Sequence, residues 1–106
     1  MTEAPIQRAI LDWLESRGTL HWRCSLGGLR IGKGGRRRNP MTGFPDIAGL
    51  QSGKFFTIEC KSPKGVLSPE QLEWKEKLQL HGCIYIVARS LGDVELALQA
   101  AAGRAG

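Results

Sequence analysis

The sequence predicts an α/β fold, in which helices flank one mixed β-sheet, and three observations lead to this prediction. The chain has 106 residues, which is the size of a single domain with one modest core. Segments with the apolar spacing of helices lie at both ends of the chain and in its second half. Short β-prone segments lie between them. The resulting order is α-β-β-β-α-β-α, a small sandwich of a sheet and its helices.

The helices are predicted from apolar spacing and from capping residues. They cover residues 3–17, 68–81 and 90–102, and residues 103–106 are expected to fray. The second helix has the most complete signals, because Ser68 is a capping residue, Pro69 occupies the first turn and Gln71 is placed for a capping box.

The strands are predicted from alternation and from apolar runs. Residues 19–26 alternate between apolar and polar side chains, and residues 44–50 and 55–61 are β-prone runs that flank a short turn. Residues 83–88 are continuously apolar, which is typical of a central strand covered on both faces.

The hairpin predicts where three charged side chains lie. A two-residue turn at Ser52-Gly53 places Asp46 opposite Glu59, and cross-strand partners have Cβ atoms roughly 5 Å apart. Because side chains alternate along a strand, Lys61 shares the face of Glu59 and Cys60 points to the other face. A salt-bridged surface face would look similar in sequence, and it remains the structural alternative.

Two adjacent carboxylates either share a proton or bind a cation. Oxygen ligands favour Mg²⁺ or Mn²⁺, and Mg²⁺ is commonly held by one or two carboxylates together with substrate phosphate. We therefore expect Asp46, Glu59 and the backbone carbonyl of Cys60 as metal ligands. Lys61 is expected to orient or deprotonate a water, or to stabilise charge in the transition state. This arrangement suits phosphodiester hydrolysis.

The positive charge of the chain is concentrated in one part of the sequence. The formal net charge is +5, and no acidic residue occurs from Ser16 to Pro45. Such a block attracts polyanions, so nucleic acid is the leading partner, although a solvated loop is the alternative. The predicted DNA contacts are Arg23, Arg30, Lys33, Arg36, Arg37, Arg38 and Lys64.

Several other classes of function are disfavoured. The basic glycine-rich loop at residues 27–43 is close to a P-loop, but Gly34 stands where a magnesium-binding Ser or Thr is required, so no nucleotide cofactor is expected. No apolar run is long enough to cross a bilayer, and the N-terminus does not resemble a signal peptide.

The cysteines and histidines indicate the compartment rather than a metal site. Three cysteines without C-x-x-C spacing fit reduced thiols and a cytoplasmic protein. The pairs His21 with Cys24 and His81 with Cys83 could be imagined as a zinc site. Both pairs lie in or beside predicted strands, where cysteine is usually a small core residue.

Four elements in order resemble the VRR-NUC branch of the PD-(D/E)xK nuclease superfamily. They are Glu3 in Glu-Ala-Pro-Ile-Gln, Gly43-Phe44-Pro45-Asp46, Glu59-Cys60-Lys61, and Gln71 opening a helix. The resemblance extends from Glu3 to about Arg89. It implies a restriction-endonuclease-like fold, Asp46 and Glu59 as metal ligands, Lys61 as the catalytic lysine, and Glu3 and Gln71 as supporting residues of the active site.

The roles of Glu3 and Gln71 come from this resemblance alone. Spacing by itself leaves Glu3 open as a favourable first-turn carboxylate and Gln71 as a capping residue. The resemblance also implies a stand-alone phage or bacterial endonuclease, similar to Holliday-junction resolvases, that acts as a homodimer on four-way or other branched DNA. Cutting two strands of a symmetric junction requires two active sites, and one chain of this size holds only one.

Two other functions remain open at this point. The chain could be a non-catalytic nucleic-acid-binding module that uses the basic loop, or a cytosolic domain whose basic loop docks an acidic protein partner.

Overall fold

The computed structural model describes residues 2–24 and 40–103, and the elements follow the predicted order. They are α1 (Glu3–Ser16), β1 (Leu20–Arg23), β2 (Ile47–Gln51), β3 (Lys54–Cys60), α2 (Pro69–Leu80), β4 (Ile84–Ala88) and α3 (Leu91–Gly103). Gly103 is thus the last residue of α3 and not part of a frayed tail, while residues 27–39 of the predicted basic loop and residues 104–106 lie outside the described part.

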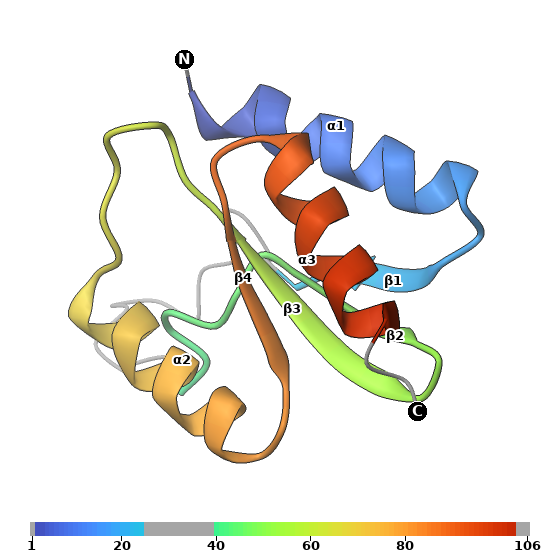
Figure 1. Ribbon diagram of the computed structural model, residues 1–106. Helices are drawn as coiled ribbons and strands as arrows, with labels where there is room; N and C mark the ends of the chain where they lie inside the picture. Colours follow the sequence, from blue (N-terminus) through green and yellow to red (C-terminus); the bar gives the residue numbers. More distant parts are fainter. Residues whose placement is uncertain (1, 25–39, 104–106) are drawn as a thin grey trace, which may run out of the picture.

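Within residues 2–24 and 40–103, four strands form one mixed sheet in the order β1-β2-β3-β4, with helices on its two sides, as the sequence predicted. Only β3 and β4 are parallel, and the other neighbours are antiparallel. This architecture is consistent with a restriction-endonuclease-like fold. Figure 1 shows α1 and α3 together on one side of the strands and α2 on the other.

The prediction that residues 83–88 form a central strand was wrong, because β4 lies at one edge of the sheet. The crossover through α2 places β4 beside β3, and no further strand follows it in the described chain. The central, most completely buried strand is β3, whose residues from Phe56 to Cys60 are all buried.

The core lies between the sheet and the pair α1 and α3. Ile10 and Leu14 of α1 and Leu98 of α3 pack there against Phe56 and Ile58 of β3. In contrast, α2 has no buried residue, so the opposite face of the sheet is only partly covered. That face is where polar side chains can reach solvent. No helix within the described residues is both long enough and apolar enough to span a membrane.

The hairpin between β2 and β3 has the predicted register. Ser52 and Gly53 both have positive φ, at 51° and 79°, as a two-residue turn that matches strand twist requires. Ile47 therefore pairs with Ile58, and Gln51 pairs with Lys54. However, β2 begins at Ile47 and not at residue 44, so Asp46 stands just before the strand.

Candidate active site

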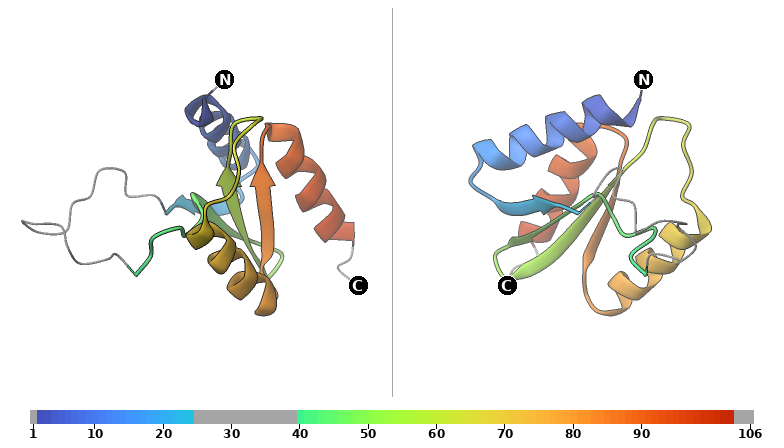
Figure 2. Two further views of the ribbon diagram at one scale, coloured as in Figure 1. Left: turned by 90° about the vertical axis from the view of Figure 1, so that its left-hand side faces the viewer. Right: turned by 180° about the vertical axis from the view of Figure 1, so that it is seen from behind.

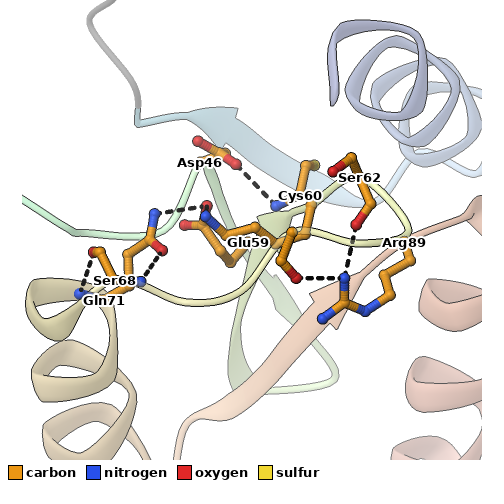
Figure 3. A network of polar contacts seen from close by, with 9 residues as sticks. Asp46, Glu59, Cys60, Ser62, Ser68, Gln71 and Arg89 are labelled. Carbon is orange, nitrogen blue, oxygen red and sulfur yellow. Dashed lines mark hydrogen bonds and ion pairs between the residues drawn. The ribbon is translucent and has the colours of Figure 1, made fainter. Parts of the chain in front are cut away.

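Two carboxyl groups meet where β2 begins and β3 ends. Asp46 Oδ2 accepts a hydrogen bond of 2.9 Å from the backbone N–H of Cys60, which fixes the aspartate beside the end of β3. Glu59 is the residue before Cys60, and only 2 % of it is exposed. Figure 3 shows both carboxyl groups at this end of the sheet. The register of the hairpin thus brings together the two acids that the sequence paired.

Burial and proximity make these two groups difficult to ionise together. The pKa of Glu59 is raised to about 8, chiefly by burial and then by the negative charge of Asp46. Burial also raises the pKa of Asp46, against the lowering effect of the hydrogen bond from Cys60. Two ionised carboxylates at this site would repel each other, and a shared proton or a bound cation removes that repulsion.

Gln71 of α2 combines both of the roles that the sequence left open. Its backbone N–H donates to Ser68 Oγ at 3.2 Å, and its side-chain Oε1 accepts from the Ser68 N–H at 2.8 Å, so the capping box is complete. The remaining amide group, Nε2, donates to Glu59 Oε2 at 3.1 Å. The cap therefore orients the side chain that holds Glu59 in place (Figure 3).

Lys61 lies beside the acid pair, as predicted. Its Nζ is 4.0 Å from Glu59 Oε2, and its side chain is 11 % exposed. The backbone N–H of Lys61 donates to the carbonyl oxygen of Ala88 at 2.9 Å, which anchors the residue to β4. The ammonium group is thus held at the acid pair on a largely buried stem.

Glu3 is exposed in the first turn of α1. Its charge nevertheless reaches the site. Burial is the largest cause of the raised pKa of Glu59, the charge of Asp46 adds to it, and Glu3 contributes more weakly. The N-terminus of α1 therefore lies on the same side of the molecule as the acid pair.

A contact that sequence reasoning missed explains why the segment that leads into Asp46 lies next to α2. Gly43 has a φ of 87°, and a Cβ added to it would lie 2.6 Å from Cβ of Glu70. Only glycine permits this close approach in that conformation. Beside it, the rings of Phe44 and Trp74 meet edge to face with centroids 5.0 Å apart, and Trp74 Nε1 donates to the Thr42 carbonyl at 3.1 Å.

These contacts hold the chain before β2 along the first turns of α2, as both views of Figure 2 show. The segment that ends in Asp46 and the helix that carries Gln71 are thereby joined outside the sheet. The signal in the sequence was the string Gly-Phe-Pro-Asp together with Trp74, three residues after Gln71. Its meaning required the partner segment to be known.

The donor atoms at the site fit a hard divalent cation. Glu59 Oε1 is buried and has no hydrogen-bond partner in the described part of the chain, so this oxygen is available to coordinate a metal ion. The Cys60 N–H faces Asp46, and in an extended strand the carbonyl of the same residue points to the same side. Burial raises the pKa of the Cys60 thiol to about 12, so its sulfur stays protonated.

Within residues 2–24 and 40–103 no three His, Cys, Asp or Glu side chains are grouped as a metal site. The available set is therefore two carboxylates and a carbonyl, which is a sparse set of the kind that Mg²⁺ accepts. For zinc, His21 and Cys24 lie at the β1 edge of the sheet, whereas His81 and Cys83 lie next to β4 at the opposite edge. This separation rules out the four-residue zinc site.

Of the seven predicted DNA contacts, Arg23 and Lys64 are described, and both are exposed. Arg23 ends β1, and the next residue, Cys24, donates its N–H to the Asp46 carbonyl at 2.7 Å. Lys64 lies in the turn that follows Lys61. The other five lie outside the described residues: Arg30, Lys33, Arg36, Arg37 and Arg38.

Comparison with known proteins adds one finding. The model of the VRR-NUC domain family matches residues 1–91, which include every element from α1 to β4 and every residue of the site. No curated protein matches the chain in sequence.

Proposed function

We propose, from the premise that the chain belongs to the VRR-NUC domain family, that this protein is a metal-dependent DNA endonuclease. Membership of the family points to a nuclease of the PD-(D/E)xK type, with DNA as its substrate. The observation that carries the finer proposal is the convergence of Asp46, Glu59 and Lys61 at the open end of β3. A buried glutamate and a half-buried aspartate beside a lysine suit hydrolysis of a phosphodiester bond.

We assign Mg²⁺ or Mn²⁺ to Asp46, Glu59 and the carbonyl oxygen of Cys60. When bound, such an ion polarises the phosphate and lowers the pKa of a water molecule. The residues of the chain do the rest. Gln71 holds Glu59 through Oε2, and the Cys60 N–H holds Asp46, so neither carboxylate must reorganise during the reaction. Lys61 orients the attacking water or balances negative charge on the phosphoryl group.

The basic residues are proposed to hold the DNA backbone. Arg23 at the end of β1 and Lys64 in the turn after Lys61 lie near the site, on separate segments. Residues 25–39, which carry five further basic residues, connect Cys24 to the segment that packs on α2. Cys24 contacts Asp46 through a backbone hydrogen bond, and the segment at the other end contacts the helix that carries Gln71. Phosphate contacts of this kind give affinity without base identity.

We further propose that the substrate is a four-way or other branched DNA and that the active form is a homodimer, since a symmetric junction presents two strands to be cut. Exposed apolar side chains support the dimer. Leu20 and Trp22 of β1 and Leu50 of β2 lie on one face of the sheet and are 60 %, 45 % and 40 % exposed. Trp22 is thus the tryptophan that we expect in the interface.

The decisive experiment incubates the purified protein with labelled four-way junction, flap and linear duplex, each with Mg²⁺, Mn²⁺ or a chelator. We expect paired nicks at the junction that require metal and are lost in Asp46→Ala and Lys61→Ala. Asp12→Ala and Lys54→Ala remove the same charges from exposed positions and should cleave normally. Undiminished cleavage by the Asp46 variant would refute the proposal, and binding without cleavage would favour a non-catalytic nucleic-acid-binding module.

The dimer is tested separately by sedimentation equilibrium. Trp22→Asp should lower the mass to that of one chain, whereas Leu80→Asp, at an 81 % exposed position on α2, should leave it unchanged. A wild-type protein that sediments as a monomer at the concentrations used for cleavage would contradict the dimer and leave the chemistry untouched.

A further inference from the structure

We infer that Arg89 is a positioning residue for Lys61, acting through the turn at residues 62–65. The inference rests on the proposed function, because it concerns the lysine of the same site. Arg89 directly follows β4, and sequence reasoning gave it no role.

One nitrogen of the Arg89 guanidinium contacts three backbone carbonyl groups of one turn. Nη1 donates to the carbonyl oxygens of Ser62 and Gly65 at 2.7 Å each and to that of Pro63 at 3.3 Å. The backbone N–H of Arg89 donates to Asp93 Oδ2 at 2.8 Å, which fixes the arginine to the start of α3. Figure 3 shows the guanidinium beneath this turn, on the side of Cys60 away from Gln71.

Hydrogen bonds from a charged donor are about twice as strong as neutral ones. The turn itself is closed by the N–H of Gly65, which donates to the Ser62 carbonyl at 3.0 Å. Pro63 and Lys64 at its tip are exposed. Arg89 therefore adds charge-assisted hydrogen bonds to three carbonyl groups of this turn.

The same turn also contacts the side chain of Lys61. A Cβ added to Gly65 would lie 3.4 Å from Cδ of Lys61 and 3.1 Å from Oγ of Ser62, so the backbone at Gly65 runs alongside the lysine side chain. The other end of Lys61 is fixed by its N–H, which donates to the carbonyl of Ala88, the neighbour of Arg89. Backbone and side chain of the lysine are thus both held by the end of β4.

This support matters because a lysine side chain has four rotatable bonds and loses rotamer entropy when it is fixed. With the turn in place, Cδ of Lys61 lies beside Gly65 and Nζ lies 4.0 Å from Glu59 Oε2. Without it, the ammonium samples positions away from the reacting phosphate. A misplacement of about 1 Å at a catalytic group can cost on the order of 100-fold in rate.

The test compares Arg89→Ala with Arg17→Ala, which removes a guanidinium that packs on Trp13 at the end of α1 remote from Glu3. Single-turnover cleavage with saturating enzyme should slow about 10-fold or more in the Arg89 variant and stay normal in the Arg17 variant. The DNA dissociation constant in chelator should change less than about 3-fold, and Arg89→Lys should restore part of the rate. Wild-type cleavage by folded Arg89→Ala would overturn the inference.

Gly65→Val provides a second route in case Arg89→Ala does not fold, because it crowds Lys61 while Arg89 stays in place. Its matched control is Gly92→Val, where an added Cβ would meet only Ser90 Oγ at 3.6 Å. Normal cleavage by Gly65→Val would count against the inference. If the wild type itself does not cleave, the proposed function fails, but hydrogen exchange at the Gly65 amide still tests the inference. Faster exchange in Arg89→Ala or Arg89→Lys than in the wild type would show that Arg89 stabilises the turn. Unchanged exchange would overturn the inference.

Discussion

Binding of Mg²⁺ or Mn²⁺ should displace a proton from the acid pair, because the pKa of Glu59 is raised to about 8 by burial and by the charge of Asp46. A carboxyl group with that pKa is about 1 % ionised at pH 6, about 9 % at pH 7 and about half ionised at pH 8. The cation binds the carboxylate and not the acid. The observed affinity should therefore rise about 50-fold between pH 6 and pH 8 and less than about 2-fold from pH 8 to pH 9.

The assay is titration calorimetry with Mn²⁺ at pH 7 in two buffers of different ionisation enthalpy, which counts the protons released. We expect about 0.9 proton per metal ion. Burial also raises the pKa of Asp46 above its ordinary value. Glu59→Gln should bind weakly and release no proton, whereas Asp12→Asn, at an exposed position of α1, should behave as wild type. Proton release near zero, with an affinity that is constant from pH 6 to pH 8, would refute the reasoning.

Three further predictions concern the same site. Because the pKa of Glu59 in the folded protein lies above its ordinary value of 4.5, its contribution to stability is present at acid pH and lost as the pH rises through about 8. The metal-free wild type should therefore lose more thermal stability between pH 5 and pH 9 than Glu59→Gln, and equal losses would contradict this. Gln71→Glu keeps an oxygen for the capping box but loses the amide that donates to Glu59. Cleavage by this variant should therefore fall about 10-fold or more, while circular dichroism at pH 5 should show a folded protein. Cleavage at the wild-type rate would show that capping α2 is the whole role of Gln71. Gly43→Ala should lower the free energy of unfolding by about 2–4 kcal/mol, from backbone strain and from the clash with Glu70. Gly53→Ala, with positive φ but open space around it, should cost only about 1 kcal/mol in the same denaturant titration, and equal costs would argue against close packing at Gly43.

Local signals in the sequence were sufficient for the elements and for the hairpin. The capping residues around Ser68 predicted where α2 begins, and Ser52-Gly53 predicted the pairing that brings Asp46 and Glu59 together. Both are short-range effects, in which one turn or one cap decides the geometry of its neighbours. The position of β4 was mispredicted for the opposite reason. An apolar run shows that a strand is covered, but its place in the sheet depends on which strands lie beside it.

The sequence by itself determined the pairing of the two acids and the place of the lysine beside them, because a two-residue turn and the alternation of side chains leave little freedom over so short a hairpin. Only the tertiary structure decided how these groups are held. Gly43 lies against Glu70, Gln71 reaches from its cap to Glu59, and Arg89 supports the turn beside Lys61. These contacts join segments that are distant in the chain, and their geometry exists only once α2 and β4 have packed against β3.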